Sequence, residues 1–228
     1  MGRIAGEGDI VIGAIIPCKK GSKGVPDKNF RDMLGQPMWH WTLEAAIDAD
    51  IFDTIIASSN GGFGVHGIYN GITYNDHENI PNIDVSSLDD LCKIYAIQYP
   101  EISVWCLLQP TSVLRNHNDI RNAYYCLCLN HYDSVVSVES VGDKYWIKID
   151  GKHKAMYDPM NRLMRQNPLT NVLFYENGAI YFFKREVILN GSRIGGDVGL
   201  YEMPQERSHQ IDSPFDWKLC EAILRERG

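Results

Sequence analysis

Short apolar runs alternate along the chain with longer stretches whose apolar positions recur every three or four residues. The runs at residues 10–16, 53–58, 103–108 and 133–138 predict buried strands. The stretches at 37–47, 88–97 and from 118 to about 131 have the spacing of amphipathic helices. Strands that alternate with helices in this way favour an α/β fold with a mostly parallel sheet.

The pattern changes after residue 140. Residues 144–152 alternate between apolar and polar positions up to Asp150-Gly151, which predicts a β-hairpin. Residues 157–173 are irregular, and residues 218–227 predict a final helix. A short helix and a short strand are also expected near residues 72–74. We therefore expect one domain over residues 1–228, whose character changes after residue 140.

Composition narrows the class of protein. A formal net charge of −7 argues against a general nucleic-acid binder, which needs positive charge to neutralise phosphates. No run approaches the roughly 20 apolar residues of a membrane span, and residues 1–9 do not resemble a secretory signal. The six cysteines lie mostly in apolar patterns, as reduced core thiols do. We expect a cytoplasmic protein with no membrane and no nucleic-acid partner.

Positive charge is concentrated in the loop that follows the first predicted strand. Residues 17–29 carry four lysines, two glycines and one serine. In open α/β sheets ligands bind beyond the carboxyl ends of the strands, where this loop lies. Glycine allows a close backbone approach, and lysine supplies compact charge. The loop is therefore a candidate triphosphate site, and a solvated lysine-rich turn is the alternative.

Several strings in this loop resemble the nucleotide loop of the acylneuraminate cytidylyltransferases, which include the CMP-sialic acid synthetases. The strings are Ile16-Pro17, Gly21-Ser22-Lys23-Gly24, Pro26 and Lys28-Asn29. The family usually has Ala-Arg where this chain has Cys18-Lys19. The resemblance implies a three-layer, Rossmann-like nucleotidyltransferase fold. It also implies that the phosphates of CTP are held by Lys19, Ser22, Lys23, Lys28 and Asn29.

Two further segments match the family in order. The start of the helix at Ser86-Ser87 suggests that the Val85 backbone and Ser87 lie near the base, and helix capping is the simpler reading of these serines. The string Leu108-Gln109-Pro110-Thr111-Ser112 resembles the family's second signature. Gln109 is then expected to hydrogen-bond a polyhydroxyl sugar, although a glutamine at this point could also simply close the strand. The family's Arg-Pro upstream of the serines is replaced by an acidic segment, residues 75–81.

The insertion and the C-terminal segment complete the resemblance. In the family an insertion, which corresponds to about residues 140–180 here, pairs two subunits. Arg165-Gln166 matches a pair of that insertion, and Glu176-Asn177-Gly178-Ala179-Ile180-Tyr181 matches its strand. The resemblance implies a homodimer whose sugar site uses Gln109, Arg165, Asn177 and Tyr181. Two aspartates hold magnesium in the family, but here Gln210 stands at the first position. Only Asp212 remains as the expected Mg²⁺ ligand.

The combined reading is a cytidylyltransferase that transfers CMP from CTP to the anomeric hydroxyl of a nine-carbon 2-keto-3-deoxy acid sugar and releases pyrophosphate. Lys19, Lys23, Gln109 and Asp212 are the expected catalytic residues. One alternative is a sugar transferase of related fold, for which Asp48-Ala49-Asp50 would be the metal motif. The other is a degenerate relative that binds nucleotide without turnover, which the Lys19 and Gln210 replacements suggest.

Overall fold

The structure is a computed structural model that describes residues 10–22, 24–64, 67–76, 87–141, 144–160 and 173–227. Lys23, Val85, Arg165 and Gln166 lie outside the described residues. No helix of the described part is long and apolar enough to cross a membrane.

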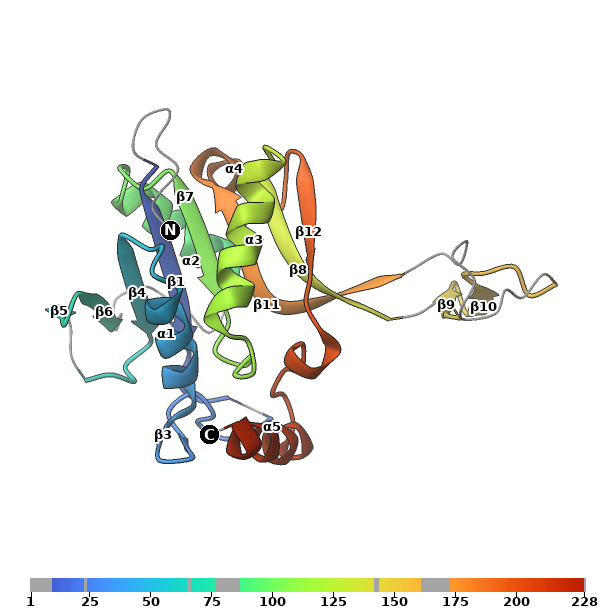
Figure 1. Ribbon diagram of the computed structural model, residues 1–228, viewed down its shortest axis with the longest axis horizontal. Coiled ribbons are helices and arrows are strands. Elements are labelled where there is room, and N and C mark those ends of the chain that lie inside the picture. The colour runs from blue at the N-terminus through green and yellow to red at the C-terminus, as the bar shows by residue number, and fades with distance from the viewer. Residues whose placement is uncertain are drawn as a thin grey trace.

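A single large sheet forms the centre of the molecule (Figure 1). Its eight strands have the order β12-β8-β11-β7-β1-β4-β6-β5. β1 pairs in parallel with β4 and β7, β4 with β6, and β8 with β12, whereas β11 is antiparallel to both of its neighbours. The strands are β1 (Ile12–Cys18), β4 (Thr54–Ser59), β5 (Gly67–Tyr69), β6 (Ile72–Asp76), β7 (Val104–Leu108), β8 (Ser134–Ser140), β11 (Phe174–Lys184) and β12 (Val198–Glu202). The predicted mostly parallel sheet is confirmed.

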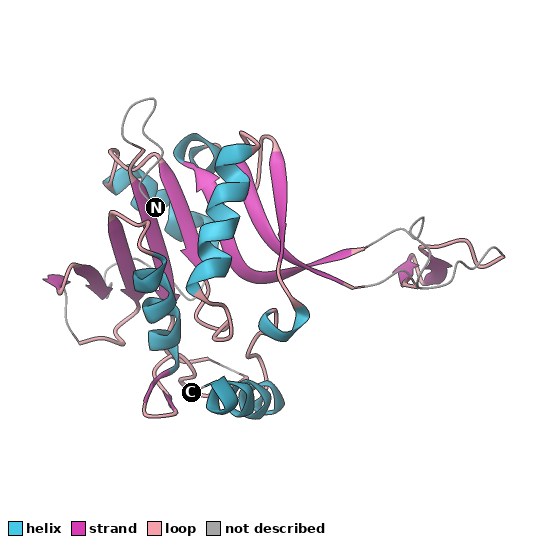
Figure 2. Cartoon of the chain, in the orientation of Figure 1, coloured by secondary structure: helices cyan, strands magenta, loops and turns pink. Residues whose placement is uncertain are grey.

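Helices cover both faces of this sheet, which gives the three layers (Figure 2). α1 (Met38–Ala49) and α3 (His117–Leu129) pack against each other and share one apolar core with the sheet. α2 (Leu88–Gln98) and α4 (Arg185–Leu189) pack together on the opposite face over a second core. The middle strands β1 and β7 are buried on both faces, which explains their continuous apolar runs.

A third apolar cluster closes the edge at which β1 ends. α5 (Pro214–Arg227) lies across this edge, at the bottom of Figure 1, and packs Trp217, Cys220 and Leu224 against residues that follow β1 and β7. A small hairpin, β2 (Asp32–Met33) and β3 (Gln36–Pro37), adds to the same cluster. The short 3-10 helix Gln205–Arg207 connects β12 to this region. The C-terminal segment is therefore packed beside the lysine-rich loop.

The helices begin where side chains satisfy their free backbone N–H groups. Ser87 and Asp90 form a reciprocal capping box at α2, and Asn116 and Asp119 form one at α3. The predicted start of α5 at residue 218 was wrong, because the helix begins at Pro214. Proline lacks the N–H that the first helical position leaves unpaired, so it suits this position.

The insertion contains the predicted hairpin. β9 (Trp146–Ile149) pairs antiparallel with β10 (Lys152–Ala155), and Asp150 and Gly151 between them both have positive φ. In Figure 1 this hairpin stands well away from the large sheet, beyond the ends of β8 and β11. The large side chains of Trp146 and Ile149 are more than half exposed there.

Other elements also differ from the prediction. The described residues between β4 and β6 contain the strand β5 and turns instead of a helix. Glycines at 61, 62, 64, 67 and 71 disfavour a helix in this stretch. α4 and β12 were not predicted, since α4 has five residues and β12 alternates only briefly between buried and exposed positions.

Candidate functional site

A cavity of about 290 Å³ opens at the carboxyl ends of β1, β4 and β7, beside the first turn of α2. This is the edge at which ligands bind in open α/β sheets. The cavity brings together most of the described residues that the sequence singled out. It is lined by Pro17, Cys18, Lys19, Ser22, Lys28, Asn29, Ser58, Ser87, Leu88, Leu91, Ile94, Gln109, Pro110 and Thr111.

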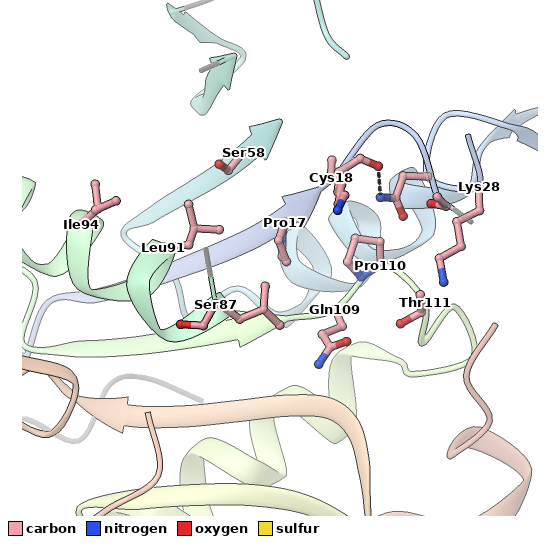
Figure 3. A pocket seen from close by; sticks show the side chains of 14 residues that line it. Pro17, Cys18, Lys28, Ser58, Ser87, Leu91, Ile94, Gln109, Pro110 and Thr111 are labelled. Carbon is pink, nitrogen blue, oxygen red and sulfur yellow. Dashed lines mark hydrogen bonds between the residues drawn. The ribbon is translucent and has the colours of Figure 1, made fainter. Parts of the chain in front are cut away.

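The two ends of the cavity differ in chemistry (Figure 3). Leu91, Ile94 and Ser58 lie at one end, and Lys28 and Thr111 lie at the other. An apolar slot suits an aromatic ring, and lysines suit phosphate groups. The cavity therefore has the polarity that a nucleotide requires.

The lysine-rich loop is held in shape by polar side chains. The Asn29 amide donates to the carbonyl oxygen of Lys19 at 2.7 Å, and Asn60, which follows β4, accepts from the Lys20 backbone N–H at 2.7 Å. Asp27 accepts from the Gly21 N–H at 3.0 Å. Asn29 is 4% exposed, and its side-chain oxygen has no hydrogen-bond partner among the described residues. Its main visible role is to position the backbone at Lys19.

Gly24 brings this loop against the C-terminal segment. A Cβ atom at position 24 would lie 2.2 Å from the carbonyl oxygen of Asp212, which no real contact allows. Lys28 adds a polar link, because its ammonium donates to the Ile211 carbonyl at 2.8 Å and to Asp212 Oδ1 at 3.0 Å. The expected metal residue thus lies directly beside the expected phosphate loop.

Near the cavity, Asp212 is a carboxylate that is available to bind a magnesium ion. The Asp212 side chain is 72% exposed, so its carboxylate is accessible. Asp216 is occupied, because one of its oxygens accepts from the backbone N–H groups of Asp212 and Ser213 and from the Ser213 hydroxyl. Partial burial opposes ionisation of Asp216, but these bonds outweigh it and lower its pKa. The described residues contain no group of three acidic, histidine or cysteine side chains arranged for a metal. Magnesium keeps several waters and often uses one or two carboxylates together with substrate phosphates, so these residues fit it.

Gln109 is positioned through a buried arginine that the sequence argument did not assign. Arg115 is 3% exposed and donates to the carbonyl oxygens of Gln109 at 3.3 Å and Ala179 at 2.7 Å. It also donates to the Thr42 hydroxyl at 2.7 Å. Burial lowers the pKa of Arg115 to about 10, so it remains charged at neutral pH. The arginine ties the end of β7 to β11 and α1.

Ser87 combines both roles that the sequence allowed. It lines the cavity, and its hydroxyl accepts from the Asp90 backbone N–H at 3.1 Å as the N-cap of α2. The hydroxyl also lies 2.9 Å from the Asp90 carboxylate. The capping interpretation is confirmed, and the base contact stays a prediction.

Asn177 and Tyr181 do not line the cavity. Asn177 is 1% exposed, and its amide joins Ser137 at 2.6 Å and Ser208 at 3.0 Å inside the protein. Tyr181 donates to Glu176 at 2.6 Å. Its ring lies 4.5 Å from the guanidinium of Arg193. Their roles toward a sugar stay predictions.

The Asp48-Ala49-Asp50 string lies at the wrong edge of the sheet for a metal at this cavity. It ends α1, after which the chain enters β4, whereas the cavity lies where β4 ends. The backbone carbonyls of Asp48 and Ala49 accept from Arg121. The motif therefore does not support a sugar-transferase metal site here.

Ser58, Leu91, Ile94 and Thr111 also line the cavity, although they were not among the predicted site residues. Ser58 belongs to the carboxyl end of a predicted strand, and this position alone could have indicated it. The two apolar residues read as ordinary positions of an amphipathic helix, so nothing in their pattern distinguished them.

Comparison with known proteins finds similarity to cytidylyltransferases. A family model described as cytidylyltransferase matches residues 13–63, which include most of β1, the lysine-rich loop and β4. An N-acylneuraminate cytidylyltransferase A from Danio rerio is 30% identical over 223 residues, which are 94% of this chain and 51% of that protein. An N-acylneuraminate cytidylyltransferase from Oncorhynchus mykiss is 31% identical over 222 residues, with 94% and 50% covered. Over nearly its whole length the chain is similar to N-acylneuraminate cytidylyltransferases. It spans about half the length of these curated relatives.

Solved structures of two other synthetases have a similar fold. A CMP:2-keto-3-deoxy-manno-octonic acid synthetase complexed with CTP has a TM-score of 0.64 at 16% identity, and the match covers 96% of this chain and 100% of that one. A 4-diphosphocytidyl-2C-methyl-D-erythritol synthase from Anaerococcus prevotii has a TM-score of 0.66 at 12% identity, with 94% and 96% covered. At such low sequence identities, the structural similarity supports the three-layer nucleotidyltransferase fold and says nothing about substrate.

Proposed function

We propose that this cytidylyltransferase homologue transfers CMP from CTP to the anomeric hydroxyl of a nine-carbon 2-keto-3-deoxy acid sugar and releases pyrophosphate. The observation that carries the proposal is the single cavity that holds Lys19, Lys28, Ser87 and Gln109 at the carboxyl edge of the sheet. Its lysine end suits the triphosphate, and its apolar end suits the cytosine ring.

The lysines and the loop backbone would bind and orient the triphosphate. Attack of the sugar hydroxyl on the α-phosphorus breaks the bond to pyrophosphate, and negative charge grows on the leaving group. Fixed positive charge lowers the barrier of such a step, together with correct positioning of the two reactants. Lys19, Ser22 and Lys28 line the cavity for this task, and Asn29 holds the Lys19 backbone. Lys23 is assigned to the same task from the sequence motif.

The sugar would lie on the side of Gln109 that faces β11. The Gln109 amide offers both a donor and an acceptor to hydroxyl groups, and Arg115 fixes the backbone from which it extends. Arg165, Asn177 and Tyr181 are assigned to the sugar from the motif. We further propose that residues 1–228 form one domain, that the insertion at about 140–180 pairs two copies of the chain as a homodimer, and that the protein acts in the cytoplasm.

Asp212 is the proposed magnesium residue. A bound Mg²⁺ would neutralise charge on the phosphates. The chain's own contribution is to place one exposed carboxylate beside Lys28, through the packing of Gly24 against the Asp212 carbonyl.

The test is pyrophosphate release with CTP and a panel of acid sugars of eight and nine carbons. Release that needs both CTP and a nine-carbon sugar supports the proposal, and binding of CTP without any release indicates the degenerate relative instead. Lys19→Ala should lower kcat/KM by about 10- to 100-fold, because a charged hydrogen bond to phosphate contributes about 1.5–3 kcal/mol. Lys19→Arg should retain activity, and Lys218→Ala on α5 serves as the charge-matched control.

A further inference from the structure

Three polar side chains form a buried chain beneath the apolar end of the cavity. Ser58 of β4 is paired in register with Pro17 of β1 on one side and with Asn75 of β6 on the other. Partners in register point to the same face of a sheet, and this face is the one that α2 covers. Tyr95 of α2 reaches down to complete the chain.

The hydrogen bonds of this chain have a direction. Tyr95 donates its hydroxyl proton to Ser58 Oγ at 2.9 Å. The Asn75 side chain hydrogen-bonds the Tyr95 hydroxyl oxygen. Because the side-chain oxygen of Asn75 has no partner among the described residues, this bond is donated by the side-chain amide N–H. Asn75, Tyr95 and Ser58 are 3%, 0% and 2% exposed. Burial raises the pKa of Tyr95, which keeps its proton in place.

This direction determines what Ser58 presents to a ligand. Its oxygen already accepts from Tyr95, and its own proton has no acceptor among the residues that the structure describes. Ser58 lines the cavity beside Leu91 and Ile94. The hydroxyl is therefore oriented as a hydrogen-bond donor at the end of the cavity that suits the base.

A donor at this point distinguishes the two pyrimidines of RNA. The ring nitrogen N3 of cytosine is an acceptor, whereas N3 of uracil carries a proton and is a donor. We propose that the Asn75–Tyr95–Ser58 chain selects cytosine over uracil, because it fixes Ser58 as a donor toward N3 of the base. The inference rests on the proposed function, since it assumes that the apolar end of the cavity holds the base.

The cost of the arrangement agrees with a functional role. The Asn75 carbonyl oxygen is buried without a partner, which lowers stability compared with an apolar side chain of the same shape. A purely structural contact at this position would be better served by such an apolar side chain. The Asn75–Tyr95–Ser58 hydrogen bonds instead direct the Ser58 hydroxyl proton toward the cavity.

The test is the calorimetric Kd of CTP and UTP for the wild type, Ser58→Ala and Tyr95→Phe. Calorimetry needs neither an acid sugar nor turnover, so its result is separate from the test of the proposed reaction. One hydrogen bond that is kept for cytosine and lost for uracil predicts a preference for CTP of about tenfold or more in the wild type. We expect Ser58→Ala to reduce this preference to near unity and Tyr95→Phe to reduce it severalfold. Tyr99→Phe, on the same helix, should leave it unchanged.

A third nucleotide distinguishes recognition of the ring nitrogen N3 from recognition of the exocyclic amino group. The triphosphate of 2-pyrimidinone riboside keeps the acceptor at N3 and lacks the amino group. It should bind the wild type closer to CTP than to UTP, and Ser58→Ala should weaken it. Equal wild-type affinities for CTP and UTP, or a preference that both variants retain while folded, would overturn the inference. Affinity of the pyrimidinone equal to that of UTP would overturn it as well.

Discussion

The ammonium of Lys28 lies 3.0 Å from Asp212 Oδ1, although 184 positions separate the two residues along the chain. The lysine side chain is 15% exposed and the aspartate side chain is 72% exposed. An ion pair with one largely exposed partner contributes little to stability. The pair therefore joins the lysine-rich loop to the proposed metal residue without being needed for folding.

The first prediction concerns magnesium. Asp212→Asn should abolish turnover while the free energy of unfolding changes by less than about 1 kcal/mol. Gln210→Asp should shift the magnesium titration of activity to lower concentration, because a second carboxylate adds negative charge near the ion. Normal turnover of Asp212→Asn with an unchanged magnesium midpoint would show that the metal is held elsewhere.

The second prediction concerns the contact between Gly24 and Asp212. Gly24→Ala should displace the C-terminal segment, because the new Cβ would lie 2.2 Å from the Asp212 carbonyl oxygen. A displacement of about 1 Å at a reacting site costs on the order of 100-fold in rate, so kcat/KM for CTP should fall by that order. Gly195→Ala is the control, since its Cβ would meet Val187 at an ordinary 3.4 Å. Unchanged kinetics of Gly24→Ala would show that this packing does not position the site.

The third prediction separates the cap of α5 from the metal residue. Asp216→Ala should lower the free energy of unfolding by about 1 kcal/mol at pH 7, because it removes the carboxylate of a capping box, and leave turnover per folded molecule intact. The pKa of Asp216 is lower in the folded protein than the usual value of 3.8. The carboxylate therefore stabilises the fold fully above pH 3.8, and this contribution is lost as the pH falls through the lower pKa of the folded state. The difference between variant and wild type should therefore shrink below about pH 4.

Denaturant unfolding at several pH values measures this difference. Glu221→Ala is the control on the same helix, because its pair with Arg225 is an exposed one and contributes at most about 0.5 kcal/mol. A stability difference for Asp216→Ala that stays constant down to pH 2 would contradict the capping assignment.

The fold and the position of the lysine-rich loop beside the cavity could be predicted because both depend on local sequence. The apolar run of β1 ends at a loop rich in lysine and glycine, and strand order places that loop at a ligand-binding edge. The capping boxes of α2 and α3 also lie within four residues of chain. The parts that were missed depend on contacts between distant segments.

Arg115 and Tyr95 illustrate the limit. Arg115 reads as a residue after a turn, and only the packing of β7, β11 and α1 shows that it is buried and bonded to the Gln109 carbonyl. Tyr95 reads as one apolar position of a helix, and only the register of β4 and β6 places Ser58 and Asn75 beneath it. Periodicity predicts which face of an element is buried and not which polar groups meet there.

The fourth prediction concerns assembly. Trp146 and Ile149 are 58% and 53% exposed on the hairpin. Large apolar side chains that are exposed close together are typical of interaction surfaces. We expect a homodimer at micromolar concentration and a monomer for the double variant Trp146→Ser, Ile149→Ser, as measured by light scattering. Ile68→Ser, which changes an isoleucine that is 72% exposed on β5, should leave the dimer intact. A fully active wild-type monomer would contradict the proposed role of the insertion.

The measurement that tests the central claim most directly follows the α-phosphorus of CTP. CTP labelled at this atom is incubated with the protein, magnesium and a nine-carbon 2-keto-3-deoxy acid sugar, and the labelled products are separated. The proposed reaction predicts that the label appears in a CMP-sugar, in a one-to-one ratio with pyrophosphate. A label that stays in CTP, or that appears only in free CMP or CDP with no sugar adduct, would contradict it.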